Sequence, residues 1–146
     1  MIDRLAALAG AARYTITRDA ESRGEVASSQ AGTTAQWIAE RCPSLDAREA
    51  GLVAKAVREL AAPELRTTAE AVAAGRLSVP AGCVIAAEWR QLEPLIEPDA
   101  GEAVPAGLVA MGVVDGSAGV RRLRPALLAR YGLGERLQYI QTGTPG

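Results

Sequence analysis

The 146-residue chain contains no histidine and no phenylalanine, and aromatic residues make up only 3% of it. Without histidine it lacks the usual general base of nucleophilic triads and the ligands of His-containing zinc and nuclease centres. Those mechanism classes are excluded for this chain. The apolar residues that remain are mainly Ala, Leu, Val and Ile, and the wealth of Ala and Leu favours helices over strands.

The chain is also poor in residues that bind metals or act as nucleophiles. Cys42 and Cys83 have no partner at metal-ligand spacing, so we expect buried thiols. Cys83 as a nucleophile is a minor alternative that needs exposure and a lowered pKa. Glu97, Asp99 and Glu102 could bind a divalent ion only if the fold brought their oxygens together. We therefore predict no catalytic, cofactor or metal site and no enzyme activity.

The chain has almost equal numbers of basic and acidic side chains, 16 and 17, which give a net charge of −1. This balance predicts no strong general affinity for nucleic acids. No apolar run approaches the roughly 18 residues of a membrane span. The start of the chain, Met1-Ile2-Asp3-Arg4, lacks the apolar segment of a signal peptide. We expect a cytoplasmic protein without a membrane partner.

The N-terminal part, 1–32, reads as a short helix followed by a mobile segment. Leu5, Leu8 and Ala12 recur at spacings of three and four, which predicts one short amphipathic helix over about 3–13. From Tyr14 onward the residues are small and polar with little periodicity, and we interpret them as a mobile connection.

Start and stop signals divide the next part of the chain into four helices. Thr33 can cap the first, and Asp46 with Glu49 forms a capping box for the second. Pro63 suits the first position of the third helix. Gly75 suits the end of that helix, where the backbone adopts a left-handed conformation. Ser78 can cap the fourth. The predicted helices are 34–42, 47–61, 63–74 and 79–92.

The C-terminal third is interrupted by prolines and glycines. We expect a helix that begins near Pro105 and a last helix over about 118–131. Pro125 inside that last helix would cost about 3 kcal/mol, which predicts a kink there. Residues 133–146 lack core-forming side chains and are predicted to be a flexible tail.

Together these patterns predict an all-α fold, an orthogonal or irregular bundle of five to seven helices, with the core domain over 33–132. Trp37 and Trp89 lie on apolar helical stripes and should pack in the core. Two helix pairs with short connections, 34–42 with 47–61 and 63–74 with 79–92, are candidates for a helix-turn-helix, and the second pair meets at the corner Gly75-Arg76-Leu77-Ser78.

Arginines and the single lysine provide the candidate contacts for DNA or a protein partner. Three of these basic residues lie on the predicted helix 47–61 and one lies at the corner. The others form a cluster over 121–130, which also contains Arg130. That cluster could meet phosphates, or could pair with Glu93, Glu97, Asp99 and Glu102. The candidate contact residues are Arg48, Lys55, Arg58, Arg76, Arg121, Arg122 and Arg124.

Four short stretches occur in an order that resembles the 13E12-repeat family, whose shared helical region is a domain of unknown function (number 222). They are Thr34-Ala35-Gln36-Trp37-Ile38-Ala39, Ser44-Leu45-Asp46-Ala47-Arg48-Glu49-Ala50, Leu60-Ala61-Ala62-Pro63 and Ala73-Ala74-Gly75-Arg76-Leu77-Ser78. The resemblance covers roughly residues 33–131. This chain departs from the family pattern at Gly82, where relatives tend to carry a larger residue, and at Pro105 and Pro125.

That family's region usually precedes an HNH nuclease domain in proteins of high-GC bacteria. The resemblance implies a non-catalytic helical module that targets or positions a nuclease, through a protein partner, self-association or weak DNA contacts. The alternative is a DNA-binding regulator of helix-turn-helix type. Nuclease activity is not implied for this chain, because the HNH centre needs histidines and the chain has none.

Overall fold

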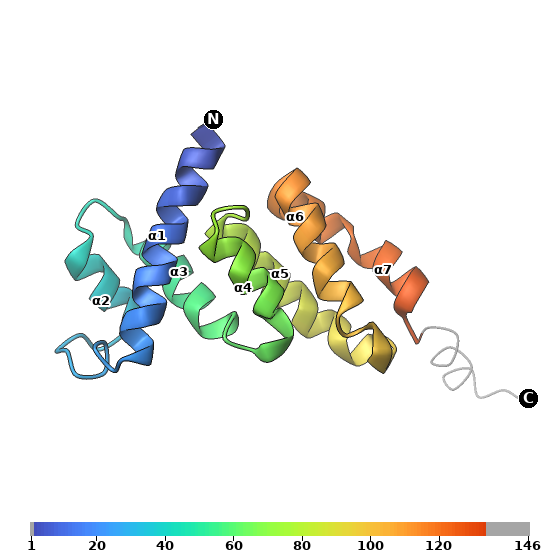
Figure 1. The fold of residues 1–146 in the computed structure, drawn as a ribbon, viewed down its shortest axis with the longest axis horizontal. Helices are drawn as coiled ribbons and strands as arrows, with labels where there is room; N and C mark the ends of the chain where they lie inside the picture. Colours follow the sequence, from blue (N-terminus) through green and yellow to red (C-terminus); the bar gives the residue numbers. More distant parts are fainter. Residues whose placement is uncertain (1, 134–146) are drawn as a thin grey trace, which may run out of the picture.

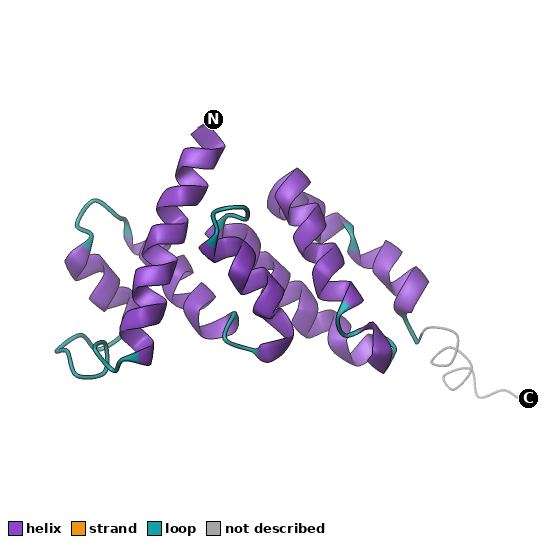
Figure 2. Ribbon diagram, in the orientation of Figure 1, coloured by secondary structure: helices purple, strands orange, loops and turns teal. Residues whose placement is uncertain are grey.

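Helices make up almost all of the regular structure in the computed structural model, which describes residues 2–133 (Figures 1 and 2). This confirms the predicted all-α bundle of five to seven helices. Short 3-10 turns, η1 (Pro63–Leu65), η2 (Glu93–Leu95) and η3 (Pro98–Ala100), join some of them. The helices are α1 (Ile2–Ser22), α2 (Thr34–Arg41), α3 (Ala47–Glu59), α4 (Arg66–Ala73), α5 (Val79–Leu92), α6 (Ala103–Arg122) and α7 (Arg124–Tyr131).

Helix α1 is much longer than predicted. It continues to Ser22, so the predicted short helix and the mobile connection from Tyr14 are wrong. The inner face of α1 consists of one tyrosine and small residues, which is why its periodicity is weak in the sequence. These buried residues are Ala11, Tyr14, Thr17 and Ala20. Residues 23–33 are irregular, as expected, although Val26 is buried in the core.

The caps predicted from the sequence are present at three helices. Side-chain oxygens of Thr33, Asp46 and Ser78 accept hydrogen bonds from the backbone N–H groups of Gln36, Glu49 and Ala81. Each bond satisfies a donor that the first helical turn leaves free, which fixes where α2, α3 and α5 begin.

Helix α5 is the central element, since it packs against α1, α3, α4, α6 and α7. It follows α4 through a tight turn in which Gly75 has a φ of 74°, the left-handed conformation predicted for this stop. Trp89 on α5 and Trp37 on α2 are each 5% exposed, which confirms the predicted core packing. The guanidinium of Arg41 covers the Trp37 ring at 4.2 Å from its centroid.

The C-terminal third differs from the prediction in where its helix breaks. Helix α6 runs from Ala103 to Arg122 and is kinked at Gly116, whose φ is 66° and ψ −160°. Pro125 does not kink a helix, because α7 begins one residue before it and tolerates proline in its first turn. Of the predicted tail, only Leu133 is described, and its N–H donates to the carbonyl of Leu95; 134–146 lie outside the described residues.

The stretch Pro98–Arg122 is long and apolar enough to cross a membrane by length and composition alone. Glu102 and Asp115 interrupt this stretch, so it contains no continuous apolar run of about 18 residues. In the fold α6 packs against α4, α5 and α7, and its side chains Val104, Leu108 and Val120 are 0% exposed. Part of the apolar surface of this helix is thus used in the protein core, whereas Val113 and Val114 are 45% and 79% exposed.

Candidate interaction surfaces

The predicted contact residues fall into three separate parts of the fold. The first part is α3, the second the turn between α4 and α5, and the third the junction of α6 with α7 (Figure 1). The residues predicted as contacts therefore do not form one continuous patch. Arg48, Lys55 and Arg58 lie on α3, Arg76 lies in the turn, and Arg121, Arg122 and Arg124 lie at the junction of α6 with α7.

A basic groove lies between α1, α3 and the start of α2. It has a volume of about 670 Å³, and Arg18, Lys55 and Arg58 line it together with small apolar residues of α3. Glu21 also lines the groove and accepts a hydrogen bond from the hydroxyl of Thr34. Three cations against one carboxylate give this groove a net positive charge, and its chemistry suits an anion such as a phosphate.

Two of the four arginines near α7, Arg122 and Arg124, form ion pairs within the chain. Arg124 donates from Nε and Nη2 to the two carboxylate oxygens of Glu88, both at 2.8 Å, and Glu88 is 7% exposed. These hydrogen bonds raise the pKa of Arg124. Arg122 reaches Asp115 at 3.6 Å across the α6 kink, whereas Arg121 is exposed. The predicted pairing with the carboxylates of 93–102 is not among the ion pairs of the described residues.

The helix-turn-helix-like corner does not expose its second helix. A recognition helix must present several side chains to the major groove. Most positions of α5 are buried instead, including Glu88 and Trp89, because α5 is the central helix. This argues against α5 as a recognition helix, although Arg76 in the turn before it remains exposed.

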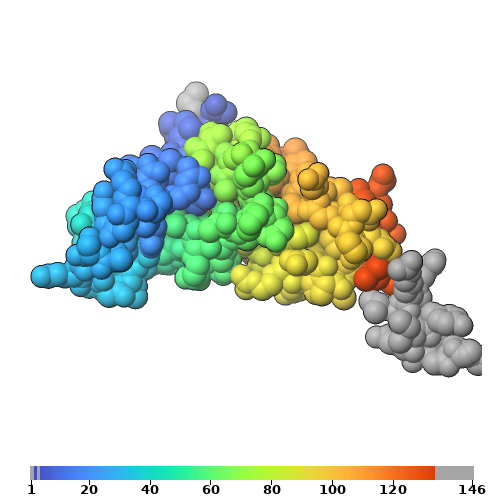
Figure 3. All heavy atoms as spheres, turned by 60° about the horizontal axis from the view of Figure 1, so that its bottom comes forward, coloured from blue at the N-terminus to red at the C-terminus, as the bar shows by residue number. Residues whose placement is uncertain are grey.

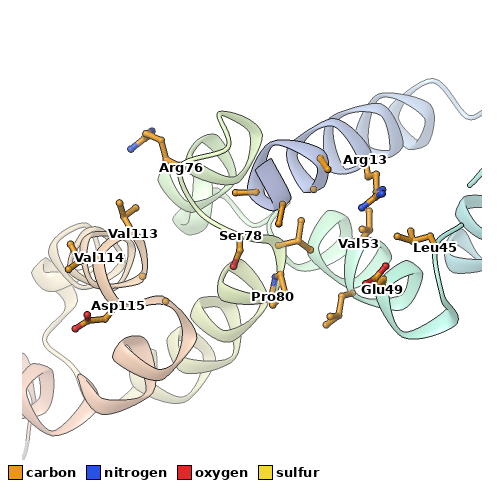
Figure 4. Close-up of a pocket in the computed structure, with 18 residues that line it drawn as sticks. Arg13, Leu45, Glu49, Val53, Arg76, Ser78, Pro80, Val113, Val114 and Asp115 are labelled. Carbon is orange, nitrogen blue, oxygen red and sulfur yellow. The ribbon is translucent and has the colours of Figure 1, made fainter. Parts of the chain in front are cut away.

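A second groove, of about 750 Å³, runs between α1, α3, α5 and the kink of α6 (Figure 4). Its lining is mostly small and aliphatic, with Arg13 and Arg76 as cations. The carboxylates Glu49 and Asp115 lie at opposite ends of the view. The hydroxyl of Ser78 accepts the capping hydrogen bond from Ala81 and has no adjacent base among the lining residues. The groove thus offers shape and apolar surface but no convergent acid, base and nucleophile.

The buried thiol of Cys83 does not meet the conditions for a nucleophile. Burial raises its pKa to about 11, against smaller opposing effects of Lys55 and Arg58. Its Sγ donates to the carbonyl of Leu52 at 3.5 Å, and the residue is 5% exposed. Since the thiolate is the reactive species, Cys83 is inert near neutral pH. No cluster of three metal-ligating side chains occurs within 2–133.

The outer face of α1 carries apolar residues that the sequence pattern placed on one side of a helix. The pattern did not show whether that side is buried or exposed. Leu5 and Leu8, whose spacing predicted one side of an amphipathic helix, are 62% and 43% exposed. The N-terminal turns of α1 extend beyond their neighbours in Figure 1, and the helix forms a continuous part of the surface in Figure 3. Among the side chains of α1 whose burial is described, Ala11 is the first buried one.

Five apolar residues follow this outer face at alternating spacings of three and four. Ile2, Leu5 and Ile16 are 83%, 62% and 63% exposed, and Ala9 and Ala12 between them are also exposed. This is the a/d spacing of a coiled-coil seam. We call these five residues the outer seam of α1. A helix that packs only one face on a protein normally has a polar opposite face, so this seam lacks a partner in the monomer.

Comparisons with known proteins do not assign a family or a function to the chain. No family model, no curated protein and no solved structure matches the chain. The similarity to the 13E12-repeat family consequently stays a prediction from its motifs.

Proposed function

We propose that the chain is a non-catalytic helical interaction module, and that the outer seam of α1 is its contact surface. The observation that carries this proposal is the exposure of Ile2, Leu5 and Ile16 on one side of a helix that packs on the protein from Ala11 onward. Removing such side chains from water stabilises a complex by about 25 cal/mol per Å² of apolar area before the costs of association.

The resemblance to the 13E12-repeat family supports the same role. In that family the helical region accompanies an HNH nuclease domain, so a module of this kind would target or assemble a nuclease in the cytoplasm. The chain has no histidine, and any such catalysis would belong to another polypeptide or domain.

The proposal is tested with a photo-crosslinking amino acid placed at Leu5 in the cells that produce the protein. We expect discrete adducts, whose second component is identified by mass spectrometry and then bound to the purified chain. The matched control places the same group at Glu64, an exposed position in η1. Equal labelling at both positions, or no adduct at Leu5, would overturn the interaction role of the seam.

The second candidate function is DNA binding through the basic groove, which the cations Arg18, Lys55 and Arg58 favour. We expect salt-dependent binding of random duplex DNA, measured by fluorescence anisotropy. Replacing Lys55 and Arg58 by Ala should reduce the slope of log affinity against log salt by about 2, since each phosphate contact contributes about 0.9. The control is Arg66→Ala, an exposed cation outside the groove. Absence of binding at low salt would exclude this candidate for the isolated chain.

A further inference from the structure

We propose that the outer seam of α1 binds the outer seam of a second copy of this chain, with the two α1 helices antiparallel. This inference rests on the proposed function and names its partner. It follows from the order of large and small residues along the seam, from the charges at its ends and from the side of α1 that the fold leaves free.

The seam is complementary to itself when two copies run in opposite directions. In an antiparallel helix pair, a positions of one helix face d positions of the other. With Leu5 opposite Ile16 of the second copy, Ala9 lies opposite Ala12 and the same contacts repeat about a twofold axis. The result is an isologous interface in which large residues close both ends and small ones occupy the centre.

The central alanines allow the helices to approach closely. Interaxial distances fall at the short end of about 8–10 Å when the side chains at the contact are small. The seam from Ile2 to Ile16 is about 21 Å long at 1.5 Å per residue. This makes a small interface, so association should be weak and depend on protein concentration.

Charge favours the antiparallel arrangement over the parallel one. Asp19 has a side chain that is 58% exposed and makes only a 3.7 Å surface pair with Arg23. In the antiparallel pair Asp19 lies beside the N-terminal end of the other α1, where the helix dipole favours negative charge. Arg13 then faces Ala6 of the other copy. A parallel pair would instead set the two positive helix ends side by side.

The rest of the fold leaves room for this contact. Helices α3, α4 and α5 pack against the inner side of α1, where Tyr14 and Thr17 are buried. Ile2, Leu5 and Ile16 on the other side stay at least 62% exposed, whereas Ala20, one turn beyond Ile16, is 2% exposed, so the free part of the seam ends at Ile16. Two copies can therefore join through α1 with their remaining helices on opposite sides of the pair.

The first test is the mass of the purified full chain by analytical ultracentrifugation from about 1 to 500 µM. We expect the mass to rise from 15.1 kDa toward twice that value. The double variant Leu5→Glu/Ile16→Glu should keep the mass of one chain throughout. Val114→Glu is the matched control, because Val114 is a 79% exposed aliphatic residue on α6, and it should dimerise as the parent does. Circular dichroism checks that each variant is folded.

The second test determines the direction of the helices by disulfide formation in a Cys42→Ser background. Leu5→Cys mixed with Ile16→Cys should give a crosslinked heterodimer. Leu5→Cys alone should not crosslink, since the two copies of position 5 would be 11 residues apart along the pair, about 16 Å. A disulfide needs Cα atoms within about 7 Å. Efficient crosslinking of Leu5→Cys with itself would show a parallel pair and overturn the proposal.

Failure of this inference differs from failure of the proposed function. A chain that stays monomeric to 500 µM, yet crosslinks from position 5 to another protein in cells, would disprove self-association and keep the interaction role. A monomeric chain without adducts from position 5 would disprove both. A mass that doubles equally in the Leu5→Glu/Ile16→Glu variant would place the dimer contact elsewhere and also overturn the inference.

Discussion

Arg124 and Glu88 form a two-point ion pair that fastens α7 to the central helix α5, although 36 residues separate them in sequence. Glu88 is 7% exposed, so Arg124 takes the place of water as the partner of its carboxylate. Removing one member of a buried pair leaves an uncompensated charge, whereas removing both does not.

The first prediction concerns this pair. We expect the melting temperature to fall in the order parent, Arg124→Lys, Arg124→Ala, because lysine keeps the charge but loses the second hydrogen bond. Arg124→Leu should also lower the melting temperature, and the double variant Glu88→Leu/Arg124→Leu should recover part of that loss. Arg122→Ala is the control, since its 3.6 Å pair with Asp115 is at the surface. Equal losses in the Arg122 and Arg124 variants would show that the buried carboxylate does not need its partner.

The raised pKa of Cys83 leads to a prediction about alkaline pH. The folded pKa of about 11 exceeds the unfolded value of about 8.5, so between these values the unfolded chain loses a proton that the folded chain keeps. Stability should therefore fall as pH rises above 8.5, by at most about 1.4 kcal/mol per pH unit. Denaturant titrations at pH 7, 9 and 10 measure this slope. Other groups titrate there too, and the slope attributed to Cys83 is the part that disappears in Cys83→Ala.

The sequence predicted those parts of the fold that depend on local chemistry. Asp46 and Ser78 mark their helix starts because a capping oxygen bonds to N–H groups only three residues ahead. Gly75 marks its turn because few other residues adopt a positive φ. These signals are readable without knowledge of the tertiary contacts.

The sequence did not predict which face of α1 is buried. Periodicity shows that Leu5 and Leu8 share a side of a helix, but not whether that side faces the protein or the solvent. Here the protein covers the side of Tyr14 and Thr17, whose mixture of sizes and polarity gives no strong pattern. The ion pair between Arg124 and Glu88 could not be predicted from local sequence patterns either, because only the tertiary fold brings α5 and α7 together.

Thr68 supplies a prediction of increased stability. It is 0% exposed on α4, and its hydroxyl has no hydrogen-bond partner. A buried hydroxyl without a partner keeps its desolvation cost, so the nearly isosteric Thr68→Val should raise the free energy of unfolding by about 1 kcal/mol. Its neighbour Thr67 is exposed, and Thr67→Val should change stability by less than about 0.5 kcal/mol. A loss of stability in Thr68→Val would show that the hydroxyl is bonded in solution.

The last prediction compares two glycines inside helices. A Cβ atom at Gly82 would lie 2.9 Å from Cγ2 of Val72 and 3.4 Å from Cδ1 of Leu60, whereas one at Gly51 on α3 would meet nothing within 4 Å. Alanine improves helix propensity by about 1 kcal/mol at either site. Gly51→Ala should therefore stabilise the protein by up to that amount. Gly82→Ala should destabilise it by about 1–3 kcal/mol, because α4 and α5 must move apart.

Urea denaturation of both variants and the parent measures the two effects under the same conditions. The sign of the difference tests the packing directly, since both substitutions add one methyl group to a helix and differ only in what that group meets. If Gly82→Ala were as stable as Gly51→Ala, the close approach of α4 to α5 would be adjustable at little cost. The glycine at position 82 would then not be required by packing.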